Sequence, residues 1–246
     1  MTNKYMYFVA NWKMYGNLSS LNALDKVIKF SKSKEIKKGR LIYCPPYTLI
    51  SSFSKKFNNC QIGIGGQNCH ESENYGPYTG YVNSRMLKNI GAHFVIIGHS
   101  ENREKGEGDK LINLKIKSAV EAKLKVIFCI GETLGQKRKK KTQSILSKQI
   151  NIGLEGIKKK SDIFIAYEPV WAIGTGIIPK SKDLLKTVEF IKSKFKDKIP
   201  KVLYGGSVNP QNINNLKEIN NIDGFLIGGA SQNTNKFIDI VKKTYS

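Results

Sequence analysis

The sequence predicts a single (β/α)8 barrel domain that spans residues 1–246. Three observations support this prediction: eight short apolar runs, helical patterns between several of them, and polar residues or glycines directly after most of them. The runs are continuous rather than alternating, as expected of parallel strands that are buried on both faces. An open, doubly wound sheet is the main alternative, because periodicity does not show whether a sheet closes.

The expected strands are rich in Val, Ile, Phe and Tyr, and they recur every 20 to 40 residues or so. In chain order they are Tyr5–Ala10, Leu41–Cys44, Ile62–Gly65, Phe94–Ile97, Val126–Ile130, Ile163–Tyr167, Val202–Tyr204 and Phe225–Ile227.

Three helices are expected between these strands. The clearest covers Ser181–Lys198, where apolar residues recur at helical spacing and Pro200 separates the helix from the next strand. A weaker pattern runs from Leu111 to Val120, and a third, less regular one runs from about Thr142 to Lys159. There is no low-complexity linker and no break in composition, which indicates a single domain.

The chain is strongly basic, with 41 Lys and Arg against 19 Asp and Glu and a formal net charge of +22. Such a charge raises the possibility of nucleic-acid binding. The densest cluster, Lys137–Lys141, falls in an expected helix start and has no interleaved aromatic residues on which bases could stack. We interpret the excess of lysine as solvated charge on helical faces and expect no nucleic-acid partner.

No apolar run approaches the roughly 18 residues that a membrane span needs, and the first residues do not have the pattern of a secretory signal. The four cysteines form no Cys-x-x-Cys pair, and Cys44 and Cys129 lie inside apolar runs as expected of small core residues. The three histidines have no zinc-like spacing. These features predict a cytoplasmic protein without a bound metal.

Residues with chemical function gather just after the expected strands. In a barrel these carboxyl ends share one face, which is where such folds place their active sites. The residues are Asn11 and Lys13, Gln67 and Asn68, His99, Glu132, Glu168, Gly205–Ser207 and Gly228–Ser231.

The most informative segment begins at Glu168, which ends an apolar run. Proline and tryptophan follow, and then a small, flexible Ala-Ile-Gly-Thr-Gly tip. A carboxylate at the base of such a loop suggests a general base beneath a lid, although an ordinary strand exit with a surface Glu is the alternative. The lid residues are Pro169, Val170, Trp171, Ala172, Ile173, Gly174, Thr175 and Gly176.

His99 precedes Ser100, which we expect to be the N-cap of a short helix with Glu101 in its first turn. The positive helix end disfavours a charged imidazole and so favours a neutral ring that donates a hydrogen bond. A structural histidine is the alternative interpretation. The glycine pairs after the last two strands resemble backbone cradles for an anion, and no nucleotide-binding motif accompanies them.

Several motifs together resemble triosephosphate isomerase, and the resemblance covers essentially the whole chain. The motifs are Asn11–Met14, Ile97–Glu101, Cys129–Leu134, Ala166–Gly176, Tyr204–Val208 and Gly228–Ser231. The resemblance implies a homodimeric TIM barrel that interconverts dihydroxyacetone phosphate and glyceraldehyde 3-phosphate in glycolysis and gluconeogenesis. No cofactor is implied.

The resemblance also implies a role for each matched residue. Glu168 corresponds to the base that moves the proton, and His99 to the neutral group that polarises the carbonyl. Lys13 supplies positive charge near the enediolate and phosphate, Asn11 a nearby hydrogen bond, and Glu101 pairs with Lys13 or closes the floor of the site. The groups implied to bind the phosphate are Asn11, Lys13, Gly174, Ser207, Gly228 and Gly229.

The chain departs from the family pattern where the resemblance implies a dimer contact. Tyr81 stands where the family usually has Glu, and Asn102 where it usually has the first Arg after His-Ser-Glu. We expect a neutral contact to replace an ion pair between subunits, a change that is close to neutral when both partners are replaced. Thr79 is retained and is expected to reach Asn11 and Lys13 of the other subunit. The Arg103–Asp109 segment is about one residue short.

Two other functions fit parts of the sequence. Another barrel enzyme acting on a phosphorylated metabolite would account for the glycine pairs, but not for Asn11, Lys13, His99 and Glu168 together. A nucleic-acid-binding protein would account only for the charge of +22.

Overall fold

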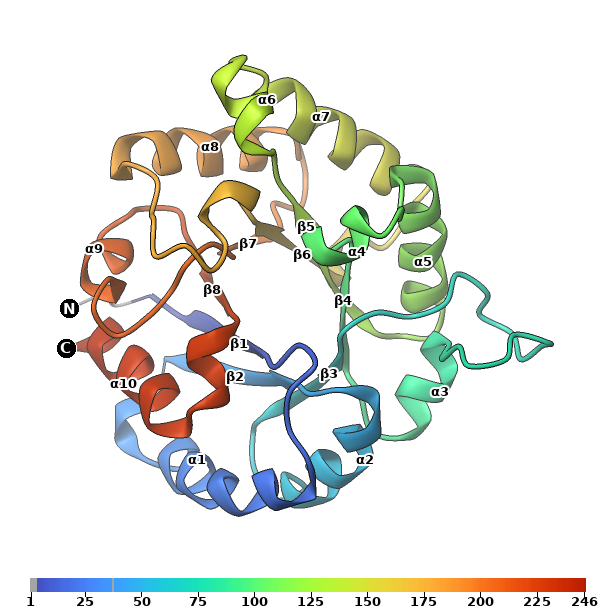
Figure 1. Cartoon of the computed structure of the whole chain (residues 1–246), viewed down its shortest axis with the longest axis vertical. Coiled ribbons are helices and arrows are strands. Elements are labelled where there is room, and N and C mark those ends of the chain that lie inside the picture. Colours follow the sequence, from blue (N-terminus) through green and yellow to red (C-terminus); the bar gives the residue numbers. More distant parts are fainter. Residues whose placement is uncertain (1–3, 37) are drawn as a thin grey trace.

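Eight parallel strands close on themselves in the computed structural model, which describes residues 4–36 and 38–246 (Figure 1). The first strand pairs with both the second and the eighth, so the barrel closes and an open doubly wound sheet is excluded. The strands are β1 Met6–Asn11, β2 Gly39–Cys44, β3 Gly63–Gly66, β4 Phe94–Ile97, β5 Lys125–Ile130, β6 Ile163–Tyr167, β7 Lys201–Tyr204 and β8 Gly224–Ile227. All eight expected strands are therefore confirmed, with boundaries that shift by no more than two residues.

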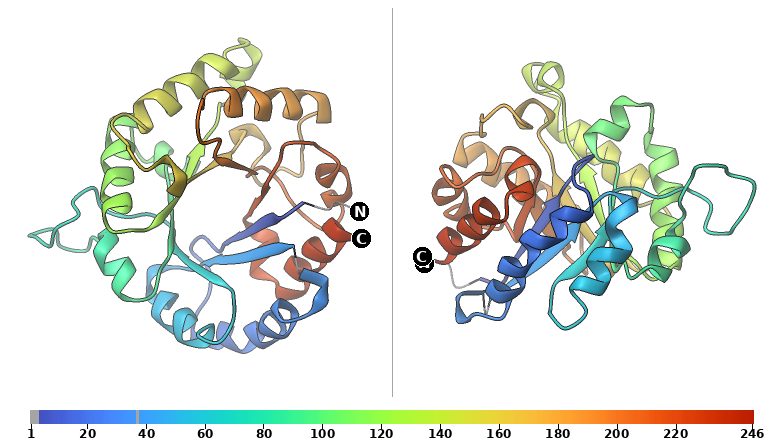
Figure 2. Two further views of the ribbon diagram at one scale, coloured as in Figure 1. Left: turned by 180° about the vertical axis from the view of Figure 1, so that it is seen from behind. Right: turned by 60° about the horizontal axis from the view of Figure 1, so that its bottom comes forward.

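Helices form a ring outside the barrel (Figure 1; Figure 2, left). The α-helices are α1 Leu24–Ser31, α2 Tyr47–Lys56, α3 Ser84–Asn89, α4 Ser100–Glu104, α5 Asp109–Glu121, α6 Leu134–Arg138, α7 Thr142–Gly153, α8 Ser181–Ser193, α9 Ile213–Lys217 and α10 Thr234–Tyr245. Short 3-10 helices are η1 Leu18–Ala23, η2 Lys34–Ile36, η3 Lys160–Asp162, η4 Val170–Ala172 and η5 Gly229–Gln232.

The three predicted helices exist, but two of them end earlier than expected. The helix predicted to reach Lys198 ends at Ser193, where the amides of Lys194 and Phe195 bond three residues back and tighten the last turn. The helix predicted to reach Lys159 ends at Gly153, and Gly156 then has φ 72°, which a right-handed helix does not continue through.

The basic run Lys137–Lys141 does not start a helix. It begins in the last turn of α6 and continues through the turn before α7. Lys140 has φ 54°, a left-handed conformation that separates the two helices.

Two apolar layers hold the barrel together. Side chains from alternate strand positions, including Val9 and Ile127, fill its interior, where Cys44 and Cys129 are also buried as predicted. The other strand faces, such as that of Phe8, pack against the helices in a larger outer core. The barrel interior is therefore a packed core rather than a pore, and a cavity can form only at the ends of the strands. None of the described helices is long and apolar enough to cross a membrane.

Candidate active site

A cavity of about 390 Å³ lies at the carboxyl ends of the strands. All four residues expected to be catalytic line it, and so do the four backbone positions expected to bind phosphate. These eight residues lie at the ends of five different strands or in the loops that follow them, and only the closed barrel brings them together. They are Asn11, Lys13, His99, Glu168, Gly174, Ser207, Gly228 and Gly229.

Glu168 follows β6 directly and is buried beneath the cavity. Its amide donates to the carbonyl of Ile130 at 2.8 Å, which fixes its backbone to the neighbouring strand. Its Oε1 lies 3.2 Å from Nε2 of His99, and its Oε2 accepts from the amide of Ser100 at 3.3 Å. Burial raises the pKa of the Glu168 carboxyl, and the nearby His99 opposes this only in part. A carboxylate in these surroundings is more basic than one in water.

Two glycines pack directly against Glu168. A Cβ added to Gly131 would lie 1.8 Å from the carbonyl oxygen of Glu168, so only glycine fits there. A Cβ added to Gly205 would lie 2.8 Å from Cγ of Glu168. Gly131 therefore packs against the backbone of Glu168, and Gly205 packs against its side chain.

His99 is itself the N-cap of α4, and the expectation that Ser100 caps this helix is wrong. His99 has an extended backbone (φ −54°, ψ 143°), and Ser100 is the first helical residue. Nδ1 of His99 accepts from the amide of Glu101 at 3.3 Å, so the imidazole replaces the hydroxyl that usually caps a helix. This bond directs Nε2 towards Glu168 and the cavity.

Lys13 has a left-handed backbone with φ 53°, which is unusual for a residue other than glycine. Its amide donates to Oδ1 of Asn11 at 3.1 Å, and its carbonyl accepts from Nε2 of Gln67 at 2.8 Å. Its Nζ lies 2.6 Å from Oε1 of Glu101, which confirms the expected pairing. Gln67 also donates to the carbonyl of Cys44 at 2.8 Å and so supports Lys13 from below. The sequence predicts Gln67 only as a polar residue after a strand and does not predict that it supports the backbone of Lys13.

The base of the lid is fastened to the end of β5. Nε1 of Trp171 donates to Oε1 of Glu132 at 3.0 Å, and the hydroxyl of Tyr167 reaches both oxygens of the same carboxylate at 3.2 Å. Nζ of Lys137 lies 3.4 Å from the centroid of the Trp171 ring. Burial raises the pKa of Glu132, and the Trp171 hydrogen bond opposes that shift. Glu132 therefore anchors the lid through a buried carboxylate.

The tip of the lid has room to move. Gly174 and Gly176 have φ 71° and 77°, and a Cβ added to either would meet no other atom within 4 Å. The amide of Ser207 donates to the carbonyl of Ala172 at 3.1 Å. In this position of the lid the Ser207 amide is therefore occupied by the lid itself.

Some residues that line the cavity were not predicted. Gly205 and Gly206 form one of the predicted glycine pairs, but their packing against Glu168 and Tyr204 depends on the closed barrel. Lys236 lines the cavity from the first turn of α10. No local signal distinguishes Lys236 from the many other lysines on helical faces.

The residues expected at a dimer contact lie beside a second cavity or on a loop near it. Thr79 and Tyr81 belong to the β3–α3 connection, which projects far beyond the barrel (Figure 1; Figure 2, right). Asn102 lines a second cavity of about 250 Å³, together with Lys13 and Glu101. Lys13 thus faces both cavities.

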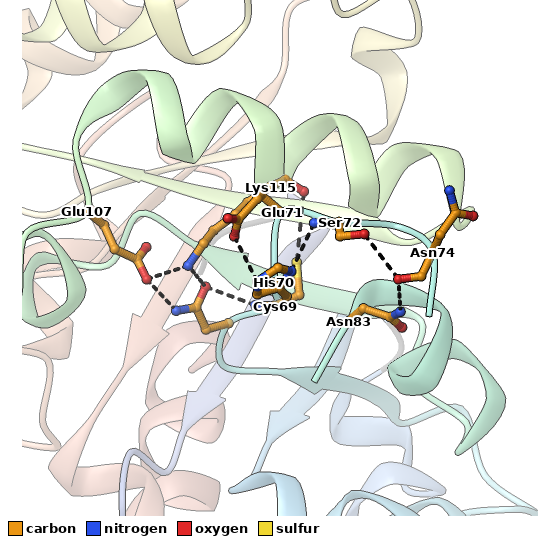
Figure 3. A network of polar contacts seen from close by, with 9 residues as sticks. Cys69, His70, Glu71, Ser72, Asn74, Asn83, Glu107 and Lys115 are labelled. Atoms are coloured by element: carbon orange, nitrogen blue, oxygen red, sulfur yellow. Dashed lines mark hydrogen bonds and ion pairs between the residues drawn. The ribbon is translucent and has the colours of Figure 1, made fainter. Parts of the chain in front are cut away.

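The base of the projecting loop is held by a buried network (Figure 3). Lys115 pairs with Glu107, and both contact the side chain of Asn68, at 3.2 Å and 2.7 Å respectively. Further along, Nδ1 of His70 accepts from the amide of Ser72 at 3.1 Å. The loop is therefore fixed where it leaves the barrel and exposed at its tip.

Comparison with known proteins decides the family. A family model described as triosephosphate isomerase matches residues 6–244. The chain belongs to the triosephosphate isomerase family. Members of this family interconvert dihydroxyacetone phosphate and glyceraldehyde 3-phosphate in glycolysis, so the expected fold, family and isomerase activity are confirmed.

Named relatives agree over nearly the full length. The triosephosphate isomerase of Thermodesulfovibrio yellowstonii is 42% identical over 245 residues, which cover 96% of this chain and 98% of the relative. That of Dictyoglomus thermophilum is also 42% identical, with coverage of 95% and 97%. The crystal structure of triosephosphate isomerase from Bartonella henselae matches with a TM-score of 0.87 at 35% identity and covers 97% of this chain and 98% of that one.

Proposed function

We propose that this triosephosphate isomerase moves its proton with the carboxylate of Glu168 while His99 polarises the substrate carbonyl. One observation carries the proposal: a buried carboxylate with a raised pKa lies 3.2 Å from an imidazole nitrogen on the floor of a cavity at the strand ends. Both side chains can reach adjacent atoms of a three-carbon substrate in that cavity.

The reaction is a redox-neutral transfer of protons. The Glu168 carboxylate takes a proton from the carbon next to the carbonyl, and His99 Nε2–H donates to the carbonyl oxygen, which gives an enediolate. His99 passes a proton from the neighbouring hydroxyl to the former carbonyl oxygen, so that the hydroxyl carbon becomes the new carbonyl, and Glu168 returns its proton to the former carbonyl carbon. His99 acts as a neutral ring, because Nδ1 accepts the Glu101 amide and Nε2 is left to carry the proton.

Lys13 supplies the positive charge near the developing oxyanion. Its ammonium lies at the cavity edge, and its strained backbone is held by Asn11 and Gln67. Such a preorganised charge stabilises the enediolate without reorganising during the reaction. Glu101 holds the ammonium in place through its contact at 2.6 Å.

The phosphate binds to Gly174, Ser207, Gly228 and Gly229 at the far end of the cavity. Because the Ser207 amide bonds to Ala172 in the present lid position, closure of the lid releases this amide for the phosphate. The binding energy of the non-reacting phosphate thereby drives closure, which excludes water from the enediolate.

We further propose that the chain needs neither metal nor cofactor and works in the cytoplasm. Acid–base groups alone suffice for an isomerisation that has no net electron transfer. Cys44, Cys60, Cys69 and Cys129 are free thiols, as suits a reducing compartment.

We also propose a homodimer in which the Thr79 loop of each subunit enters the second cavity of the other. Large apolar side chains near that cavity and on the loop are exposed in the single chain, including Met14 at 93% and Tyr81 at 66%. Exposure of this kind marks an interaction surface. Tyr81 and Asn102 provide a neutral contact where the family usually has an ion pair.

Turnover of glyceraldehyde 3-phosphate by the purified chain, in a coupled assay at moderate salt, tests the proposed roles. Glu168→Gln is expected to lower turnover by about 10² to 10⁴, because it removes a positioned base. Glu189→Gln, at an exposed position on α8, is the matched control and is expected to keep full activity. If a folded Glu168→Gln protein retained more than about a tenth of wild-type turnover, another residue would be the base.

A further inference from the structure

Six lysines from two separate segments line one cavity on the face of the barrel opposite the active site. The cavity, of about 640 Å³, lies between the α7–β6 and α8–β7 connections. Both connections lead from a helix into a strand, so they lie at the amino ends of the strands, the face seen in Figure 2, left. The lysines are Lys158, Lys159, Lys160, Lys194, Lys196 and Lys198.

This lysine cavity has an apolar base and almost no negative charge. Ile157 and Phe195 are buried and line it, and Asp197 is the only acidic residue among the described residues that do. Within the described part of the chain, none of the six lysines forms an ion pair. By contrast, the neighbouring Lys192 and Lys201 both pair with Asp223, at 2.7 Å and 3.6 Å.

Helix ends do not explain this concentration of charge. Cations are favourable near the last carbonyls of a helix, and Lys194 directly follows α8. The effect fades beyond the last turn, whereas Lys158 to Lys160 lie at least five residues past the end of α7. Six like charges around one cavity that a single described acidic residue, Asp197, also lines repel one another and form a site of strong positive potential.

We propose that the lysine cavity binds an oligophosphate, an anion with several linked phosphate groups. Lysine ammonium groups bind phosphate as point charges, and six of them match a ligand that carries several negative charges. The volume falls in the range of small-molecule sites, about 300–1,000 Å³. The site is separate from the active site, because none of its lining residues also lines the catalytic cavity.

A small oligophosphate fits this cavity better than a nucleic acid does. Nucleic-acid surfaces combine an extended basic groove with aromatic side chains on which bases stack. Phe195, the one aromatic residue among the described residues that line this cavity, is buried and therefore a poor surface for a base to stack on.

Calorimetric titration of the purified enzyme with inorganic tripolyphosphate at low salt tests the proposal. We expect one site per chain and weaker binding as salt is added. The triple variant Lys158→Gln, Lys160→Gln, Lys196→Gln should weaken binding by about tenfold or more, since it removes three of the six charges. The matched control removes the same charge from the densest basic run: Lys139→Gln, Lys140→Gln, Lys141→Gln should bind within about twofold of wild type.

Three results would overturn the proposal. Equal loss in both triple variants would show a general attraction to the positive surface. Competition by saturating dihydroxyacetone phosphate would place the tripolyphosphate in the catalytic cavity. Two results together would indicate a nucleic-acid surface instead: tripolyphosphate binds no tighter than inorganic monophosphate, and a single-stranded oligonucleotide loses affinity for the cavity variant. Isomerase turnover, expected to be unchanged in both variants, confirms that they fold.

Discussion

Oε1 of Glu168 lies 3.2 Å from Nε2 of His99, and both side chains are buried. The imidazole and the Ser100 amide stabilise the carboxylate, but desolvation outweighs them, and the pKa of Glu168 is raised. The proposed base thus has a basicity set mainly by burial, and that property can be measured.

The first prediction concerns pH. The acid limb of kcat/KM should follow an apparent pKa above 4.5, the ordinary value for Glu, because Glu168 must be ionised to accept a proton. A pH profile of kcat/KM between pH 4 and 8 checks this. An acid limb at or below 4.5 would contradict the effect of burial.

The same group links stability to pH. Since folding raises the pKa of Glu168, its contribution to stability is present below the unfolded pKa and is lost as the pH rises through the folded pKa. Glu168→Gln removes this titration. The free energy of unfolding of the variant relative to wild type should therefore increase as the pH rises from 4 to 7, as measured by urea denaturation. A difference that is constant over this range would be inconsistent with the raised pKa.

Gly205→Ala should lower kcat without unfolding the barrel. The added Cβ would lie 2.8 Å from Cγ of Glu168 and displace the carboxylate. Small displacements of a catalytic group cost up to about 10² in rate, and we expect a loss of about tenfold or more. Gly135→Ala, where the added Cβ comes no closer than 4.0 Å to Thr133, is the control. Unchanged kcat in a folded Gly205→Ala protein would show that Glu168 tolerates the shift.

Gly229→Ala should affect KM rather than kcat. A Cβ at Gly229 meets no protein atom within 4 Å, so the fold should remain intact. The methyl group would occupy space that the phosphate needs, and we expect KM to rise about tenfold while kcat changes little. Steady-state kinetics separate the two constants. Equal losses of kcat in Gly205→Ala and Gly229→Ala would contradict the proposal that Gly205 positions the base whereas Gly229 binds the phosphate.

Trp171→Phe should destabilise the protein by about 1–3 kcal/mol, because it removes a donor from the buried Glu132 carboxylate. Urea denaturation gives the difference. Lys137→Met removes the cation over the ring and its attraction for the Glu132 carboxylate but no hydrogen bond to it, and should cost less, about 0.5–1 kcal/mol. A larger effect from Lys137→Met would show that the cation rather than the hydrogen bond anchors the lid.

Thr79→Asp should prevent dimer formation and lower turnover. The new carboxylate would enter a cavity lined by Lys13 and Glu101 of the other subunit. It would repel Glu101 and compete with it for the Lys13 ammonium, which would disturb both the contact and the charge at the active site. Analytical ultracentrifugation together with turnover checks both effects, and Thr79→Ser is the matched control. A stable wild-type monomer with full activity would rule out the required dimer.

The sequence predicts the strands well because each is buried on both faces, which leaves a continuous apolar run. The eight residues that the sequence assigns to the site all line the catalytic cavity, since each of them lies in a motif at or near a strand end or in the lid. Helix ends are predicted less well. Lys140 and Gly156 have positive φ angles that a right-handed helix cannot continue through, and the pattern of apolar residues does not show these angles.

Other features depend on packing between distant segments. Ser100 has the side chain usually preferred at an N-cap, and only the fold shows that the His99 imidazole takes this place. Lys236 and the lysine cavity likewise arise where separate segments meet. The bond between Ser207 and Ala172 depends on the lid position, which a strand-and-motif pattern does not contain.

The left-handed backbone of Lys13 limits how far this enzyme can be stabilised by engineering. A non-glycine residue with that geometry costs roughly 1–2 kcal/mol, so a search for stabilising substitutions would select glycine or asparagine there. Either change would remove the ammonium group from both cavities that Lys13 faces. Thermostable variants of this enzyme must therefore gain their stability elsewhere, and position 13 belongs on the list of residues that a designer leaves fixed.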